Sequence, residues 1–145
     1  MSDHTGIAPS TIRAYEDSDF HIAADPPFVM HPDQQCAQLA ALYDSTSTIS
    51  TTSCAYISAC NPNGETADAT KNAGRQEALI NTLETRGLPY LRGAAEDPRG
   101  KYPPEPGCLI LGISRDDAIA IGGQLQQNAI LFASADATPR LVLLR

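Results

Sequence analysis

The sequence predicts an α/β or α+β fold, in which about three helices pack on a mixed β-sheet in a single domain. Short apolar runs of strand length alternate with longer segments of helical periodicity in the middle of the chain. The chain has 145 residues, which is enough to bury a core and lies within the usual size of one domain. We expect residues 1–10 to form a flexible N-terminus and residues 11–145 to form the globular domain.

The first part of this domain is predicted to begin with a hairpin. Residues 11–15 and 20–23 are β-prone and flank a polar turn, which is typical of two paired strands. The tandem prolines within residues 25–30 favour a connection or an irregular edge over a central strand.

A helix is expected next, because Pro32 fits a first helical turn and the apolar residues after it have helical spacing up to about Asp44. These apolar residues are Cys36, Leu39, Ala40 and Tyr43. We interpret the Ser/Thr-rich run 45–52 as a solvated connector, with a phosphorylation tract as the alternative.

Residues 53–60 form the stretch around which the chain is organised. They are small, apolar or β-prone and carry no charge, which predicts a strand buried on both faces. Turn chemistry in residues 61–64 ends the strand. A helix follows, with Asp68 or Thr70 as its N-cap and Gly87 as its C-cap. The polar loop between strand and helix lies at the carboxyl end of the strand, where ligands bind in open α/β sheets.

The next segments are a short strand at 88–91 and a long loop at 92–106. This loop is rich in Gly, Pro and charge, and loops of this length are often functional or mobile; in a small-molecule site it would form a lid. An apolar strand at 108–113 follows. Ser114 with Asp117 is typical of a capping box and predicts a helix that ends near 126–128, with Gly122 allowing close packing. The last strands are expected at 129–133 and 141–144.

Composition excludes several classes of function. The formal net charge of −7, without a basic cluster, argues against binding to a nucleic-acid backbone or an anionic membrane. No apolar run approaches the roughly 20 residues that span a bilayer. The start of the chain does not resemble a signal peptide, so we expect a cytoplasmic protein.

The four cysteines are predicted to be structural thiols. Cys36, Cys54, Cys60 and Cys108 form no CxxC pair and have no ligand spacing with the three histidines. We therefore predict no metal site and no cofactor. Phosphate-loop, dinucleotide, zincin and hydrolase motifs are also absent from the sequence.

The segments that carry a family resemblance occur in a specific order along the chain. They are 14–15, 55–62, Asn72 with Arg75, 96–98, Gly100, Glu105, 109–113, Ala118 and 127–130. Together they resemble a bacterial family known as domain of unknown function 3293, over residues 11–144. Cys60 stands where the family often has Trp, and Gln126 where it has Gly. The resemblance implies a fold and a residue list, with no established reaction.

The candidate site lies at the carboxyl edge of the sheet. Its predicted residues are Asn61, Asn72, Arg75, Glu105, Gln127 and Asn128. Asn72 and Arg75 are three apart and share a helix face.

Two hypotheses follow for this site. In the first, the protein is a binding or interaction module. Its polar residues form a closed network in which Arg75 pairs with Glu105, and its acidic surface suits a basic protein partner. In the second, it is a small enzyme acting on a charged metabolite or nucleotide-like ligand, with Arg75 holding the anion and Glu105 as general base.

Overall fold

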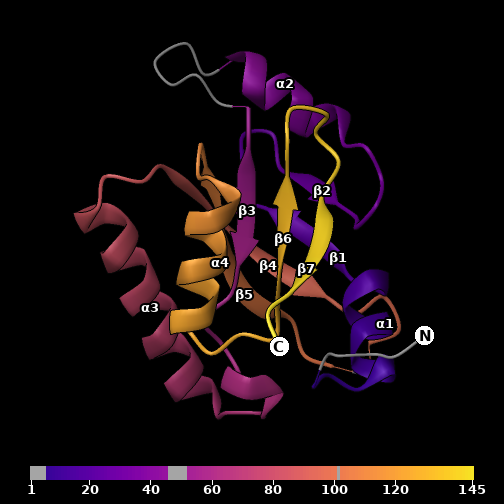
Figure 1. Ribbon diagram of the computed structural model, residues 1–145, viewed down its shortest axis with the longest axis vertical. Helices are drawn as coiled ribbons and strands as arrows, with labels where there is room; N and C mark the ends of the chain where they lie inside the picture. Colours follow the sequence, from indigo (N-terminus) through magenta and orange to yellow (C-terminus); the bar gives the residue numbers. More distant parts are fainter. Residues whose placement is uncertain (1–5, 46–51, 101) are drawn as a thin grey trace.

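The computed structural model describes residues 6–45, 52–100 and 102–145. Its element order differs from the expected one mainly at the N-terminus (Figure 1). The elements are α1 (Pro9–Asp17), β1 (Asp19–Ile22), β2 (Phe28–Met30), α2 (Ala37–Ser45), β3 (Cys54–Ile57), the 3-10 helix η1 (Pro62–Gly64), α3 (Ala69–Thr85), β4 (Tyr90–Glu96), β5 (Glu105–Leu111), α4 (Arg115–Gln124), β6 (Ala129–Ala133) and β7 (Arg140–Leu143).

The strands form one curled seven-stranded sheet in the order β2-β1-β4-β5-β3-β6-β7. The expected class is confirmed in its α+β form. The sheet is antiparallel at every ladder rather than a mixture of directions. Helix α3 connects β3 to β4, but β5 lies between these two parallel strands. Helix α4 connects β5 to β6, with β3 between them. This is split βαβ connectivity, so strand–helix alternation here does not produce parallel neighbours.

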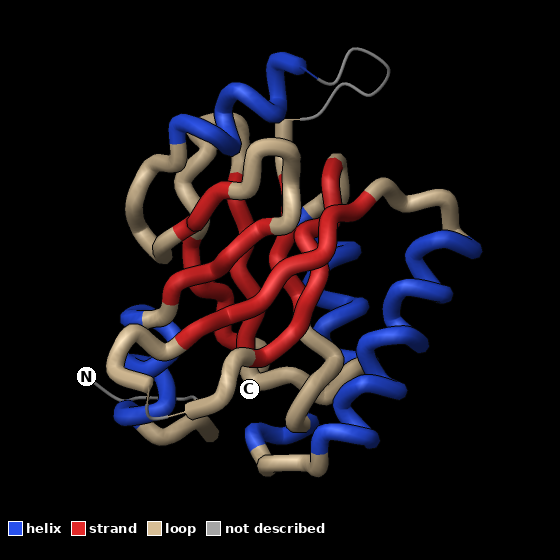
Figure 2. The backbone as a smooth tube through the Cα atoms, turned by 180° about the vertical axis from the view of Figure 1, so that it is seen from behind, coloured by secondary structure: helices blue, strands red, loops and turns tan. Residues whose placement is uncertain are grey.

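The two faces of the sheet are covered differently. Helices α3 and α4 lie side by side on one face (Figures 1 and 2), where they pack on a cluster that includes Ile57, Ile110 and Ile130. The other face is concave. It packs Tyr56 and Leu109 against α2 and against the side chains of β1 and β2. All four residues of β3 are buried, as expected for a strand with a layer on each side.

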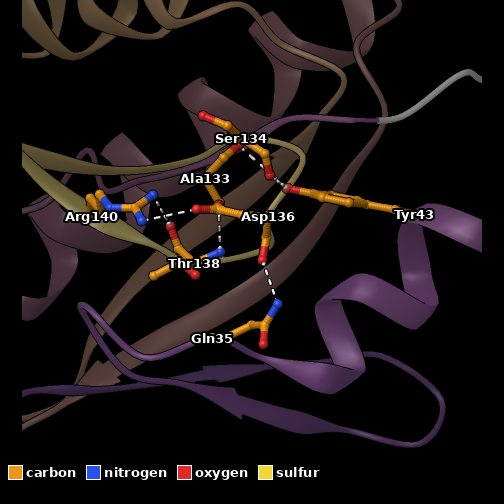
Figure 3. A network of polar contacts seen from close by, with 7 residues as sticks. All are labelled: Gln35, Tyr43, Ala133, Ser134, Asp136, Thr138 and Arg140. Carbon is orange, nitrogen blue, oxygen red and sulfur yellow. Dashed lines mark hydrogen bonds and ion pairs between the residues drawn. The ribbon is translucent and has the colours of Figure 1, made fainter.

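Helix α2 is fixed to the turn between β6 and β7, at one end of the sheet (Figure 3). The Tyr43 hydroxyl donates to the carbonyl oxygens of Ala133 and Ser134, at 3.3 and 3.1 Å. Gln35 donates its side-chain amide to the carbonyl of Asp136 at 3.0 Å. These bonds hold the curled sheet together at the end where β3 begins.

The predicted strand at 11–15 is wrong, because these residues belong to α1. Pro9 occupies the first turn of this helix, where its fixed φ favours helix and its missing N–H costs nothing. The expected hairpin is therefore also wrong, and β1 pairs with β2 and β4 instead. The boundary predicted at residue 10 falls inside α1, and residues 1–5 lie outside the described residues.

The predicted loop at 92–106 is wrong in its bounds. Strand β4 runs through Glu96, and β5 begins at Glu105. The glycines that indicated a loop are needed inside the strands: Gly93 and Gly107 are cross-strand partners, and the ring of Tyr56 lies over both. Most of the Ser/Thr connector, residues 46–51, lies outside the described residues.

The predicted helix caps of α3 and α4 are confirmed. Asp68 accepts a hydrogen bond from the amide of Lys71, and Ser114 accepts one from Asp117. Gly87 has φ +68°, and its amide bonds Glu84 while that of Leu88 bonds Leu83, which is a Schellman motif.

The four cysteines are all free and buried, so they pack as small apolar side chains. Within the described ranges, no three His, Cys, Asp or Glu side chains gather as metal ligands would. None of the helices in those ranges is both long and apolar enough to cross a bilayer.

Candidate functional site

The structure brings the six predicted residues to one end of the sheet. Because β3 is antiparallel to both β5 and β6, its carboxyl end lies beside their starting ends. This end also receives the first turns of α3. The residues placed there are Asn61 after β3, Asn72 and Arg75 in α3, Glu105 at the start of β5, and Gln127 and Asn128 just before β6.

The three consecutive carbonyl groups of residues 59–61, just after β3, all accept hydrogen bonds. Two of the donors come from residues distant in the sequence, and the third comes from the turn that follows. Arg75 donates its Nε to the carbonyl of Ala59 and its Nη2 to that of Leu125, the latter at 2.8 Å. Gln127 donates its Nε2 to the carbonyl of Cys60 at 3.0 Å. The carbonyl of Asn61 accepts the amide of Gly64 at 3.0 Å. All three backbone carbonyls of residues 59–61 are therefore paired, and these hydrogen bonds fix the path of the chain.

These contacts correct the expected pairing of Arg75 with Glu105. Two of the three guanidinium nitrogens of Arg75, Nε and Nη2, donate to backbone carbonyls, while Glu105 accepts from a neutral amide. The physical reason is that the chain after β3 leaves the sheet and loses its ladder partners, so the nearest strong donor satisfies its carbonyls.

Asn61 connects this segment to Glu105. Its backbone is left-handed, with φ 49° and ψ 59°, a conformation that Asn adopts more readily than most residues. Its Nδ2 donates to Oε2 of Glu105 at 2.9 Å. Its Oδ1 accepts the amide of Ala67 and the Nδ2 of Asn72, both at 2.9 Å, and its own amide donates to Oδ1 of Asn72 at 3.0 Å. The Asn61 side chain thus has one orientation, aimed at Glu105.

Glu105 projects from the concave face of the sheet. It lies two residues from Gly107 and four from Leu109, which pairs with Tyr56, so all four share that face. Burial raises the pKa of Glu105 above its usual 4.5, against hydrogen bonds from Ser58 and Asn61 that lower it. Among the salt bridges within the described ranges, none joins Glu105 to a Lys or Arg.

The charge of Glu105 reaches three neighbouring groups. Burial raises the pKa of Tyr15, of Tyr56 and of Cys60, and the negative charge of Glu105 adds to the increase in each case. The site therefore holds two phenols and a thiol in their neutral forms around one carboxyl group. A nucleophilic role for Cys60 is unfavourable here, because a reactive thiol needs a lowered pKa.

Asn128 belongs to a separate group of contacts. Its Nδ2 donates to the Tyr15 hydroxyl at 3.1 Å, and its Oδ1 accepts from Arg145 at 3.0 Å. These bonds attach α1 and the last residue to the polar end of the sheet. The side chain also packs on Gly64, where a Cβ would lie 2.6 Å from the Asn128 Nδ2.

Arg75 also borders an open depression of about 790 Å³ beside the start of α3. Residues of both charges line it, including Glu65, Asp68 and Lys71, and Glu105 is not part of its lining. The structure thus separates the surface of Arg75 from the carboxylate that was expected to act with it.

The six predicted residues at this end of the sheet all fall within the segment that one family model matches. The model for a family described as Protein of unknown function (DUF3293) matches residues 57–130. The chain belongs to the DUF3293 family. The region matched runs from the end of β3 to the start of β6 and contains all six predicted residues. No curated protein and no solved structure matches the chain.

Sequence reasoning missed three side chains that α1, β3 and the segment after β3 bring to the site. They are Tyr15, Tyr56 and Ser58, the last of which donates to the carbonyl of Pro106 at 2.9 Å. One signal for Tyr56 was available in the sequence. It is the only large ring in a run of small residues, and two of the glycines in the following segments give it room.

Proposed function

We propose that this DUF3293 protein is a binding module whose ligand contacts Glu105 at the polar end of the concave face. One observation carries the proposal. Side chains from α3 and from the loop after α4 fix residues 59–61, and the outcome is an Asn61 amide aimed at a half-buried carboxyl group. Burying a carboxylate beside neutral donors costs free energy, so a network that secures it favours a functional role over a packing role.

The predicted residues take two roles in this proposal. Asn72, Arg75 and Gln127 are positioning residues, because their side chains hydrogen-bond to Asn61 and to the backbone carbonyls before it rather than to a ligand. Glu105 presents its carboxyl group to the ligand, and Asn61 orients that group through its hydrogen bond. The contacts do not support Arg75 as the holder of an anion, and a small anionic ligand would be repelled by Glu105.

An enzyme with Glu105 as general base is a second candidate, favoured by the raised pKa of this carboxyl group. A base works best when its pKa lies near the operating pH. In this reading the Asn61 hydrogen bond orients the carboxylate toward the proton it removes.

A thermal-shift screen against a metabolite library tests the proposed function. The comparison uses wild type, Glu105→Gln and, as a matched control, Glu65→Gln, which changes an exposed carboxylate. A ligand that binds the folded state raises the melting temperature by mass action. We expect ligands whose shift is lost in Glu105→Gln and kept in Glu65→Gln. If every shift persists in Glu105→Gln, Glu105 is not part of a binding site. Release of product from any such ligand would distinguish the enzyme from the module.

A further inference from the structure

The Tyr56 side chain crosses the concave face over a pair of glycines. Tyr56 is 3% exposed. A Cβ at Gly107 would lie 2.6 Å from the Tyr56 hydroxyl oxygen, and one at Gly93 would lie 3.0 Å from the ring. Since Gly93 and Gly107 are directly paired across β4 and β5, two missing side chains make the space for this ring. The hydroxyl group therefore lies over β5 near Gly107, two residues from Glu105.

The Tyr56 hydroxyl has no hydrogen-bond partner in the part of the chain that the structure describes. Buried polar groups are paired in most proteins, and the negative charge of Glu105 acts on this hydroxyl and raises its pKa, so one external partner that reaches both groups would complete their hydrogen bonding. A Tyr hydroxyl can both donate and accept, whereas an ionised Glu105 can only accept. A partner that touches both groups must therefore supply hydrogen-bond donors.

The charge around this point also favours one class of partner. Glu105 accepts a hydrogen bond from Asn61, which is neutral. The nearby cation Arg145 is engaged by Asn128. The whole chain has a net charge of −7, which raises the concentration of cations at its surface.

We propose that Glu105 and the Tyr56 hydroxyl bind a small organic cation, either a protonated amine or a guanidinium group. Glu105 is its counter-ion and Tyr56 its second hydrogen-bond partner. The edge-to-face contact between the rings of Phe20 and Tyr56, with centroids 4.9 Å apart, holds the Tyr56 side chain in place. This inference rests on the proposed function and adds the chemical class of the ligand.

The test compares molecules of one size and three charges. Butylammonium and methylguanidinium are the cationic probes, butanol is the neutral control and butyrate the anionic control, all at constant ionic strength. Binding to the full chain is measured by calorimetry and by thermal shift. We expect both cations to bind wild type, with the affinity falling about 10- to 100-fold in Glu105→Gln because a charge-assisted hydrogen bond is lost.

Two further variants separate a built site from general attraction to an acidic surface. Tyr56→Phe keeps the ring and removes only the hydroxyl, so we expect weaker cation binding in a protein that remains folded. Glu65→Gln reduces the net negative charge by the same one unit at an exposed position and should bind the cations as wild type does. Equal cation affinity in wild type and Glu105→Gln, or no cation binding to wild type, would overturn the proposal.

The outcomes also separate this inference from the proposed function. If neutral or anionic metabolites bind through Glu105 while the cations do not, the proposed binding module is supported and the assignment of a cationic ligand is wrong. If no compound of any charge depends on Glu105, both fail.

Discussion

The side-chain amide of Asn61 donates a 2.9 Å hydrogen bond to Oε2 of Glu105, which joins the turn after β3 to the first residue of β5. The bond depends on the left-handed backbone of Asn61, which turns its side chain back toward the sheet. It depends equally on Asn72, which bonds both the amide and the side-chain oxygen of Asn61. The placement of Glu105 is therefore coupled to the start of α3.

The two contributions of Asn61 can be separated by substitution. Asn61→Gly permits the left-handed backbone and removes the side-chain bonds, so we expect the free energy of unfolding to fall by about 1–3 kcal/mol. Asn61→Ala should lose roughly 1 kcal/mol more, because Ala is strained at this φ. Urea denaturation of both variants measures the difference.

Asn63→Gly is the matched control for this pair. Asn63 is also left-handed, with φ 60°, but its side chain is exposed. We expect its free energy of unfolding to stay within about 0.5 kcal/mol of wild type. A loss at Asn63 equal to that at Asn61 would mean that the turn matters and the bond to Glu105 does not.

The raised pKa of Glu105 predicts a specific dependence of stability on pH. The folded state holds this proton more tightly than the unfolded chain, whose Glu titrates near 4.5. The stability that the protonated group contributes is therefore complete below about pH 4.5 and is lost as pH rises through the folded pKa. Glu105→Gln cannot lose this proton. We expect its unfolding free energy, relative to wild type, to increase between pH 4 and pH 7, as measured by urea denaturation across this range. A difference that is constant with pH would show that Glu105 has an ordinary pKa.

Arg75 is predicted to stabilise the fold through geometry rather than charge. Its guanidinium group bridges the carbonyls of Ala59 and Leu125, which lie on different segments. Arg75→Lys keeps the charge but has a single ammonium group that cannot reproduce the fixed fork. We expect a loss of about 1–3 kcal/mol in unfolding free energy, measured by denaturant titration. Arg92→Lys is the control, because Arg92 is exposed and its ion pair with Glu77 contributes little. Equal effects at the two positions would contradict the bridging role.

Local chemistry explains which elements could be predicted. The caps at Asp68, Gly87 and Ser114 depend on bonds between residues at most five apart, so the sequence around them contains the whole interaction. The same reasoning failed at residues 11–15. There the side chains are compatible with a strand, but Pro9 lies in the first turn of α1 and favours a helix.

The arrangement of the site depends on contacts that are distant in the sequence. Strand β3 pairs with β5 and β6, which start about 50 and 75 residues later, and local periodicity says nothing about such neighbours or their direction. The pairing of Arg75 with an acid was expected from charge alone. It failed because the unpaired carbonyls at Ala59 and Leu125 appear only after the chain has folded. The residue types of the site were therefore predictable, while their partners were not.

Adjacent glycines in α4 provide a last prediction, in which opposite effects come from neighbouring positions. A Cβ at Gly122 would lie 2.7 Å from Cδ1 of Leu144 and 2.9 Å from Cγ2 of Ile130, so the helix must approach the sheet without a side chain there. Gly122→Ala should therefore lower the unfolding free energy by about 1–3 kcal/mol through overpacking.

Gly123 is exposed, and a Cβ at this position would meet nothing within 4 Å. Gly123→Ala should raise the unfolding free energy by about 0.5–1 kcal/mol, because Ala loses less backbone entropy than Gly in a helix. Thermal and urea denaturation of the two variants measure both effects. Since both substitutions improve helix propensity equally, their difference isolates the contact between α4 and the sheet. If both variants were stabilised, Leu144 and Ile130 would have room to move, and α4 would be packed less closely on β6 than the structure indicates.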